Sequence, residues 1–383
     1  MLLSCVIKHI LQVETDDGFC HAWLDVVKNP LVIYNHQMKK ILFIGDCGNF
    51  GETSNGVYAK NIQLLSRLNE LSFSVKHVNT NNWKKNPCIL IKVAYAIWQY
   101  RKVNIIISLN TYSSYKLIKI VWRLFPSIRL NYFVIGGILP TYISRMGEKR
   151  RACYSIVKWF MVESNKMKQN MELLGFRNVL YVPNFKKISY IPAKQSKDAN
   201  TFKFVFLSRI IPEKGCGLII EAAKRINEKI GGHQFVVHFY GKIDDEYRPQ
   251  FTDIIKKIPN LEYKGFLNLS EKSGYDVLAG YSVMLFPTFW KGEGFPGILI
   301  DAMIAGLPVV ASEWGYNAEI IENGKTGLII ESQNVEALVD AMKLFISNKR
   351  IVDDMAQQCR LQAVKYDAAA VLTKELFRKI LNS

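Results

Sequence analysis

Two acidic residues and three glycines lie close together in the segment 291–301, which reads Lys-Gly-Glu-Gly-Phe-Pro-Gly-Ile-Leu-Ile-Asp. Pro296 suits the first turn of a helix, because its missing N–H would be unpaired there anyway. Glu293 would then lie in the loop before this helix, and Asp301 in its second turn. The free amides of a helix N-terminus can bind a phosphate. Two carboxylates that accept hydrogen bonds from hydroxyls, with a phosphate site between them, suit a nucleotide sugar. The alternative is a surface Glu and an ordinary helix-face Asp.

Two cations, Arg209 and Lys214, follow the apolar run 202–207. Ligands of open parallel sheets bind beyond the carboxyl ends of the strands, so two cations there indicate an anionic ligand. Charge-assisted hydrogen bonds of this kind contribute about 1.5 to 3 kcal/mol each. If a diphosphate leaves during the reaction, its growing charge would also be stabilised. The alternative is that Lys214 is a solvated residue at a helix start.

A glycine-rich turn, residues 45–56, follows the apolar run 41–45 and ends with Asn55 and Gly56. Glycine lets the backbone approach a ligand closely. The strict Gly-x-Gly-x-x-Gly pattern of a dinucleotide site is absent, so a flexible loop is the alternative.

Strand-like and helix-like stretches alternate along the first half of the chain after residue 38. A helix is expected over 57–71, and strands over 41–45, 73–78, 103–109, 130–135 and 179–182. Such alternation predicts a parallel sheet that is covered by helices on both faces. Residues 186–202 have the composition of a linker.

The same alternation starts again after the linker. Expected strands are 202–207, 235–240, 261–265, 283–287, 308–311 and 327–330, and expected helices are 214–230, 247–258, 271–278, 296–305, 335–347 and 367–382. The sequence therefore predicts an α/β protein with two doubly wound, Rossmann-like domains that face each other across a cleft. Their expected bounds are 38–190 and 200–366, with an N-terminal extension before them, possibly disordered, over 1–37 and a C-terminal helix after them over 367–383.

Composition excludes several classes of protein. With 383 residues, 49% hydrophobic and 22% charged, the chain is too apolar for a disordered protein. Its seven cysteines form no Cys-x-x-Cys pair, so neither a zinc site nor a disulfide framework is indicated, and a reducing cytoplasm is expected. No apolar run approaches the roughly 20 residues that span a bilayer. Lys8 and the nearby Glu14, Asp16 and Asp17 do not match a signal peptide.

The whole of the net charge of +17 comes from one half of the chain. Residues 39–197 hold 26 basic and 6 acidic side chains, whereas residues 198–383 hold 22 and 23. Basic and large apolar residues are interleaved over 91–102 and 115–123, which read as helices with a cationic and an apolar side. Three interpretations remain open: solvated faces of core-packed helices, attachment to an anionic lipid surface, or nucleic-acid binding. No nucleic-acid-binding motif supports the third.

Together these segments resemble the family 4 retaining glycosyltransferases, which have the two-domain GT-B fold. The resemblance covers about residues 39–383. It rests on the acidic pair Glu293 and Asp301, on the Arg-x-x-x-x-Lys-Gly pattern of Arg209 and Lys214, and on further matching residues: Val182-Pro-Asn-Phe185, Gly265, Pro287 and the stretch 318–328.

The resemblance implies a role for each of these residues. Glu293 would contact the donor sugar, Asp301 the ribose, and Arg209 and Lys214 the diphosphate. The residues implied to lie near the donor are Gly294, Phe295 and Pro296 from the second domain, and Asn55 and Gly56 from the first. The last helix would return to the first domain.

Two positions depart from the family pattern. Asp301 stands where Glu is usual, so the ribose contact could be longer or bridged by water. The segment 133–140 lacks the histidine that many members have, so no histidine role is carried over.

We therefore expect a retaining hexosyltransferase. It would move a sugar from a nucleotide sugar to a lipid-linked or polysaccharide acceptor of O-antigen, capsule, lipopolysaccharide or exopolysaccharide biosynthesis. The expected location is peripheral, at the inner face of the plasma membrane, with no nucleic-acid partner. Because cations and helix amides neutralise the diphosphate, no metal or other cofactor is expected, and no Asp-x-Asp appears to hold one. The alternatives are a sugar-nucleotide epimerase of the same fold and a non-enzymatic basic adaptor for a membrane or nucleic acid.

Overall fold

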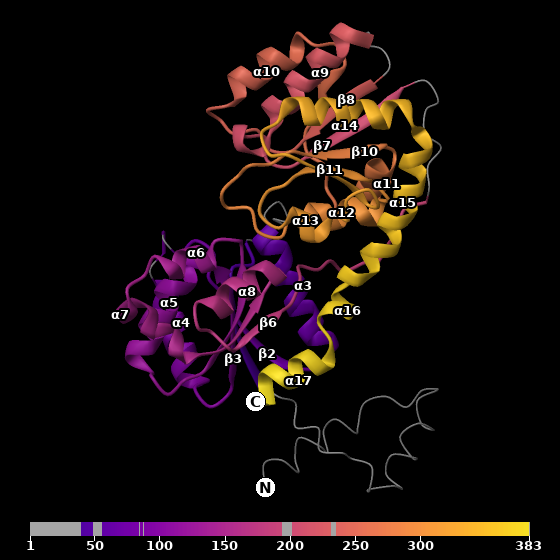
Figure 1. Cartoon of the computed structure of the whole chain (residues 1–383). Helices are drawn as coiled ribbons and strands as arrows, with labels where there is room; N and C mark the ends of the chain where they lie inside the picture. The colour runs from indigo at the N-terminus through magenta and orange to yellow at the C-terminus, as the bar shows by residue number, and fades with distance from the viewer. Residues whose placement is uncertain are drawn as a thin grey trace, which may run out of the picture. The chain divides into compact units, whose positions relative to one another are not determined.

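The computed structural model describes residues 40–48, 56–83, 85–86, 88–193, 201–230 and 235–382 (Figure 1). The predicted extension, residues 1–37, lies outside this part of the chain, as does Asn55. The residues from Lys40 onward form one compact unit with two sheets.

The first sheet is parallel, with the strand order β2-β1-β3-β4-β5-β6. With its covering helices it forms what we call the first lobe. Its strands are β1 (Lys40–Gly45), β2 (Ser74–Asn79), β3 (Asn104–Asn110), β4 (Leu130–Ile135), β5 (Val157–Val162) and β6 (Val179–Tyr181). Its helices are α3 (Gly56–Glu70), α4 (Cys88–Gln99), α5 (Thr111–Leu124), α6 (Leu139–Ser144), α7 (Glu148–Arg151), η1 (Ala152–Ile156) and α8 (Asn165–Leu173).

The second sheet is also parallel, with the order β12-β11-β10-β7-β8-β9, and belongs to the second lobe. Its strands are β7 (Phe202–Leu207), β8 (Phe235–Tyr240), β9 (Leu261–Tyr263), β10 (Val283–Phe286), β11 (Val309–Ser312) and β12 (Gly327–Ile330). Its helices are η2 (Pro212–Lys214), α9 (Cys216–Ile230), α10 (Arg248–Lys256), α11 (Lys272–Ala279), α12 (Gly297–Ala305), α13 (Asn317–Ile320) and α14 (Val335–Ser347). The predicted fold class of two doubly wound α/β domains is confirmed.

Continuous apolar strands explain why helices cover both faces of each sheet. In β1 the run from Ile41 to Ile44 is fully buried, although successive side chains point to opposite faces. Leu42 and Ile44 pack into one hydrophobic cluster, and Ile41 and Phe43 into another on the opposite face. A strand of this kind is stable only where both faces are covered, as in parallel α/β sheets.

The chain end differs from the prediction of a single helix over 367–383. A long helix that was not predicted, α15 (Lys349–Ala363), is followed by η3 (Val364–Tyr366), α16 (Ala368–Val371) and α17 (Lys374–Asn382). The helix breaks at Leu372, whose backbone leaves the helical region. The strand β5 and the helix α8 were also not predicted. The helix α8 is largely polar and has no clear hydrophobic period. The strand β5 has a lysine at its second position, as the predicted strand β7 does, so this lysine does not explain why β5 was missed.

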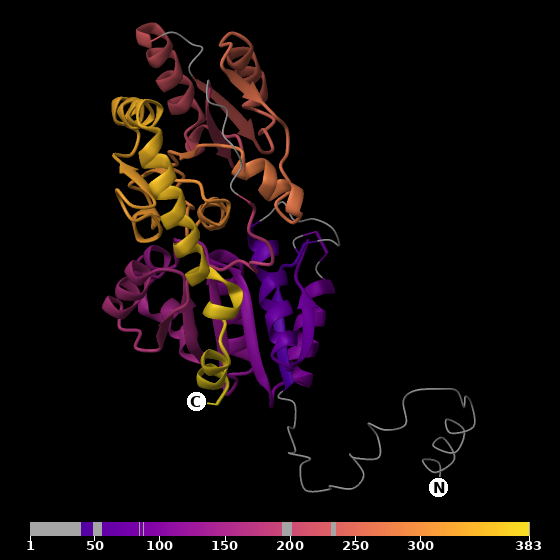
Figure 2. The ribbon, with the colours of Figure 1, turned by 90° about the vertical axis from the view of Figure 1, so that its right-hand side faces the viewer.

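These last helices bring the chain back to the first lobe, as the resemblance implied. Figure 2 shows them descending along one side of the molecule from the second sheet to the first. Phe377, Ile380 and Leu381 of α17 are buried with Ile41 and Phe43 of β1. The first lobe is therefore completed by the end of the sequence.

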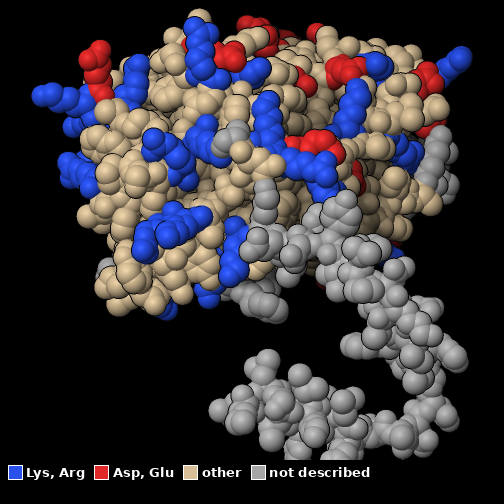
Figure 3. Space-filling view, turned by 90° about the horizontal axis from the view of Figure 1, so that it is seen from below, with Lys and Arg blue, Asp and Glu red and all other residues tan. Residues whose placement is uncertain are grey.

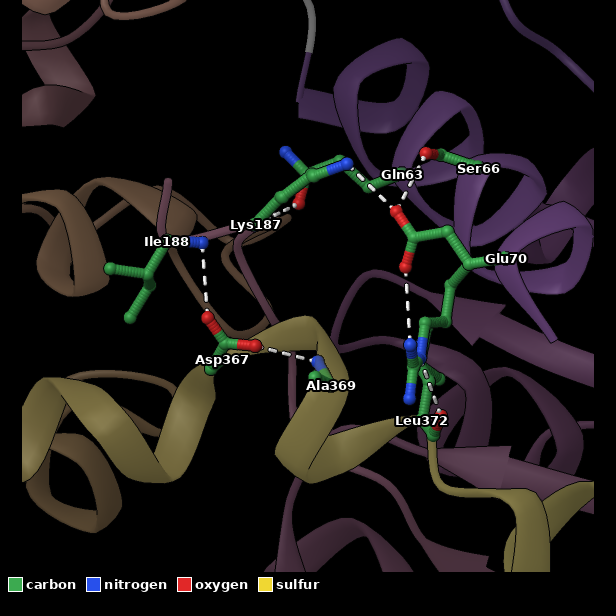
Figure 4. A network of polar contacts seen from close by, with 9 residues as sticks. Gln63, Ser66, Glu70, Lys187, Ile188, Asp367, Ala369 and Leu372 are labelled. Carbon is green, nitrogen blue, oxygen red and sulfur yellow. Dashed lines mark hydrogen bonds and ion pairs between the residues drawn. The ribbon is translucent and has the colours of Figure 1, made fainter. Parts of the chain in front are cut away.

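A polar network joins the two places where the chain passes between the lobes (Figure 4). Asp367 accepts hydrogen bonds from the amides of Ile188 and Ala369, at 3.1 and 2.6 Å. Lys187 donates from its ammonium to Glu70 of α3 at 2.7 Å, and from its backbone to Gln63 at 3.0 Å. The outgoing linker and the returning segment are thus tied to each other and to α3.

Replacing Phe377 by Ala should lower the free energy of unfolding by about 3 to 5 kcal/mol, because it removes a large side chain from a closed core. Thermal and denaturant unfolding measure this. Leu173→Ala on α8 is the control, since that side chain is 85% exposed. Equal stability of the two variants would show that α17 does not belong to the core of the first lobe.

Candidate active site

The predicted site residues of the second lobe follow neighbouring strands. Arg209 follows β7, and Glu293 follows β10, which pairs directly with β7 in parallel. The strand order reverses at this pair, because β8 lies on the far side of β7 and β11 on the far side of β10. A reversal of this kind leaves a crevice beyond the carboxyl ends of the strands, and ligands bind there.

Glu293 and Lys214 form a buried ion pair in this crevice. The same carboxylate oxygen accepts a hydrogen bond from the hydroxyl of Thr288 at 2.9 Å. Burial lowers the pKa of the Lys214 ammonium, and the negative charge of Glu293 opposes this effect. Two charges removed from water need such mutual compensation. The structure thus brings together two of the residues that the sequence analysis selected.

Trp290 joins Arg209 to this pair. The Arg209 guanidinium carbon lies 4.7 Å from the centre of the indole ring, and the Lys214 nitrogen lies 4.8 Å from it. The backbone of Trp290 accepts a hydrogen bond from the indole of Trp314 at 2.8 Å. Both cations therefore interact with one aromatic ring, at distances typical of cation–π contacts. The sequence analysis missed Trp290, although an aromatic residue one position before the segment 291–301 was a usable signal.

Asp301 lies in a separate cluster. It is 3% exposed, in the second turn of α12 as predicted. Its two oxygens are bound by the ammonium of Lys186 at 2.8 Å and by the hydroxyl of Tyr275 at 2.6 Å. Within the described residues, no hydrogen bond or ion pair joins Asp301 to Arg209, Lys214 or Glu293. Its predicted contact with a ribose stays a prediction, and a ribose would have to share the carboxylate with two protein groups.

Lys186 and Asn184 show that the linker takes part in the site. The side-chain amide of Asn184 donates to the carbonyl of Phe295 at 3.0 Å. The backbone of Lys186 pairs with the returning chain, through Tyr366 at 2.9 Å and Ala368 at 2.8 Å. The sequence analysis treated residues 186–202 as a spacer only. Lys186, a cation directly after Val182-Pro-Asn-Phe185, was the signal in the sequence that could have indicated this role.

Glycines bring the backbones of the two lobes together beside Glu293. A Cβ atom on Gly137 would lie 2.4 Å from the carbonyl oxygen of Glu293, and one on Gly294 would lie 2.8 Å from the Cα of Gly136. The hydroxyl of Tyr316 also donates to the carbonyl of Gly137 at 3.0 Å. The segment 133–140, for which no histidine role could be carried over, therefore contributes backbone to the site.

One predicted residue, Pro296, differs in place from the expectation. Pro296 precedes the helix as its N-cap and is not in the first turn, because α12 begins at Gly297. Gly56 begins α3, and no heavy atom other than those of its chain neighbours and its own helix backbone lies within 4 Å of the position that a Cβ atom would take. The contact of Gly56 with a diphosphate stays a prediction. Asn55 lies outside the described residues.

A cavity of about 810 Å³ opens beside Glu293 and is lined by both lobes. Of the four charged residues predicted for the site, Glu293 alone lines it. Lys214 contacts the cavity wall through Glu293, whereas neither Arg209 nor its partner Trp290 lines the cavity. In the part of the chain that the structure describes, no group of three or more His, Cys, Asp or Glu side chains is placed to hold a metal ion.

Comparison with known proteins matches the second lobe to a family model. Residues 187–363 match the family model of the glycosyl transferases group 1. The chain is 27% identical over 214 residues to a poly(ribitol-phosphate) alpha-N-acetylglucosaminyltransferase of Staphylococcus aureus, covering 54% of this chain and 41% of that protein. It is 26% identical over 168 residues to the UDP-Gal:alpha-D-GlcNAc-diphosphoundecaprenol alpha-1,3-galactosyltransferase of Escherichia coli, covering 43% of this chain and 41% of that protein. The match therefore spans about two fifths of each relative.

Solved structures resemble the whole described fold. Anabaena HepE in complex with UDP superposes with a TM-score of 0.66 at 14% identity, covering 90% of this chain and 100% of that one. Sucrose-phosphate synthase from Thermosynechococcus elongatus gives a TM-score of 0.69 at 14% identity, covering 90% and 99%. The two lobes thus have the GT-B fold, and residues 187–363 match the glycosyl transferases group 1.

Proposed function

We propose that this protein is a retaining glycosyltransferase that moves a sugar from a nucleoside diphosphate to a lipid-linked or polysaccharide acceptor in cell-surface polysaccharide biosynthesis. The observation that carries the proposal is the cluster of Arg209, Lys214 and Glu293 around Trp290, at the strand reversal of a group 1 domain. Two relatives are named for polymer or lipid-linked acceptors, and a third, CapM of Staphylococcus aureus, for capsular polysaccharide.

In the proposed reaction the bond between the anomeric carbon and the diphosphate oxygen breaks, and a bond from the acceptor hydroxyl oxygen to that carbon forms. The hydroxyl proton passes to the leaving phosphate on the same face of the sugar, which retains the configuration. Arg209 and Lys214 would stabilise the charge that grows on the diphosphate. They would do this without a metal ion, because two positive charges beside the diphosphate would supply the neutralisation that a metal otherwise gives.

The epimerase alternative needs a histidine in the site. Among the described residues, His77 packs against Phe43 and contacts Cys47, while His238 contacts Tyr281, and neither lines the cavity. A transferase needs no such residue, so the arrangement favours transfer.

The outer face of α4 supports binding to an anionic membrane surface. Ile91, Tyr95 and Trp98 are 70%, 60% and 50% exposed, although Val93 and Ile97 of the same helix are buried in the core. A merely solvated face would not expose large apolar side chains beside Lys92. Arg101 stacks on Trp98 at 5.2 Å from the ring centre.

Basic side chains predominate over acidic ones on the face seen from the first-lobe end (Figure 3). No helix within the described ranges is long and apolar enough to cross a bilayer. We therefore propose that α4 and α5 dock the protein on the inner face of the plasma membrane, through apolar contacts and attraction to anionic headgroups.

The purified protein should consume one member of a panel of nucleoside diphosphate sugars and release the nucleoside diphosphate. Glu293→Ala should lower turnover by about 100-fold, the cost of removing one preorganised transition-state contact. Glu246→Ala, an exposed carboxylate of the same lobe, is the control. Unchanged turnover in Glu293→Ala would remove Glu293 from the site, and conversion of the donor to an epimer without release would favour the epimerase.

Lys186→Met should raise the donor KM about tenfold and leave kcat less affected, because Asp301 loses the cation that orients it. Lys186→Arg should restore part of the affinity. Lys187→Met is the matched control, since that side chain is 57% exposed and pairs with Glu70. Initial rates over a range of donor concentrations measure both constants. An equal change in Lys187→Met would show that Lys186 acts only through the linker.

Replacing the five basic residues Lys92, Arg101, Lys116, Lys119 and Arg123 by Gln should release the protein from vesicles that contain anionic lipid. Each basic residue near the surface contributes about 1 kcal/mol to such binding. Flotation measures the bound fraction, and five exposed lysines of the second lobe serve as the control: Lys224, Lys242, Lys256, Lys257 and Lys272. Vesicle binding that persists after the five replacements in the first lobe would contradict the assignment.

A further inference from the structure

The cavity beside Glu293 has walls of different charge. The first-lobe wall contains Arg145 and Lys166 and no acidic residue, whereas the second-lobe wall contains Glu293, Glu313 and Glu319 with Lys291. The first-lobe wall is formed by α6, α8 and the start of α5, and Figure 1 places α6 and α8 on the side of the lobe that faces α13. A ligand between these walls would therefore meet a net positive charge on the first-lobe wall only.

Two of the three carboxylates on the second-lobe wall already have an ion-pair or hydrogen-bond partner within the protein. Glu293 pairs with Lys214, as described above. The oxygens of Glu319 accept hydrogen bonds from the backbone amides of Asn165 and Lys166, at 2.7 and 3.0 Å, where α8 begins. Neither the Arg145 guanidinium nor the Lys166 ammonium has an ion-pair partner among the described residues. Their charges thus remain available to a ligand.

Aromatic rings lie beside these cations on the same wall. Tyr112 and Tyr142 form an edge-to-face pair with ring centres 5.1 Å apart, and both line the cavity. Tyr112 is 57% exposed. Exposed tyrosines offer an apolar ring face and a hydrogen-bonding hydroxyl together, as a sugar ring requires. The wall therefore combines contacts for a sugar with contacts for an anion.

We propose that Arg145 and Lys166 form a subsite for a phosphate group of the acceptor, next to an acceptor sugar that packs on Tyr112 and Tyr142. This inference deepens the proposed function and rests on it. Guanidinium binds phosphate oxygens through two parallel hydrogen bonds, and an ammonium adds a second charge. A lipid diphosphate and a phosphodiester in a polymer both present the same phosphate oxygens to the site.

Binding of inorganic pyrophosphate tests the subsite without any acceptor. An excess of nucleoside diphosphates fills the donor site, and phosphorus NMR then follows added pyrophosphate. The wild type should bind it, and the double variant Arg145→Gln, Lys166→Gln should bind it at least tenfold more weakly. The control Lys149→Gln, Arg177→Gln removes two first-lobe charges that do not line the cavity. Equal binding by both double variants, or none by the wild type, would overturn the proposal.

A separate calorimetric titration with nucleoside diphosphates keeps the two proposals apart. Its failure would contradict the proposed function, whereas failure of pyrophosphate binding alone would contradict the phosphate subsite.

Transfer to matched acceptors identifies the source of the phosphate. The same terminal sugar is offered on a short-chain lipid diphosphate, on a phosphodiester-linked oligomer and on a neutral alkyl chain. The ratio of kcat/KM for the favoured phosphorylated acceptor to that for the neutral one should fall at least tenfold in Arg145→Gln, Lys166→Gln and stay constant in the control. The source of the phosphate is the acceptor whose higher kcat/KM, relative to the neutral acceptor, is lost in the double variant. A ratio that stays constant in both variants would overturn the inference.

Discussion

The ion pair between Lys214 and Glu293 is the interaction on which the site depends. Each charge lies away from water, and each is tolerable because the other is present. Their contact holds the end of η2, after β7, against the loop after β10, so that the crevice at the strand reversal has a defined shape. Trp290 and Thr288 complete the arrangement through contacts that do not depend on a ligand. A diphosphate entering this crevice would give Lys214 a second anionic partner. The positive charge that is proposed to bind the diphosphate is therefore in position before the diphosphate arrives.

The connection between the lobes joins the two domains and also contributes side chains to the site. Asn184 and Lys186 reach from the linker to the loop and helix that carry Glu293 and Asp301. The backbone of Lys186 is bound to the segment that returns to the first lobe. Any movement of one lobe against the other would change the geometry at these contacts, so the position of Asp301 is coupled to the crossing between the lobes.

Much of the fold and part of the site could be predicted from the sequence. Buried parallel strands such as β1 and β10 are continuous apolar runs, and they were found. The polar helix α8 lacks such a signal and was missed, whereas β5 was missed although its sequence is as apolar as that of β7, which was found. Glu293 and Lys214 were recognised from their spacing. Trp290 and Lys186 were not, because their importance comes from contacts between segments that are distant in the sequence. The positions of these contacts follow from the tertiary fold, and no local pattern contains them.

The close approach of Gly136 and Gly137 to the backbone of Glu293 and Gly294 has an evolutionary consequence. At this seam the lobes meet through main-chain atoms, which every amino acid shares, and there is no space for a Cβ atom on Gly137 or Gly294. A side chain at either glycine would push the lobes apart, so diversification toward new acceptors has to use the surrounding walls. Divergent descendants of this protein would then keep Gly137 and Gly294 while the tyrosines and cations around them change.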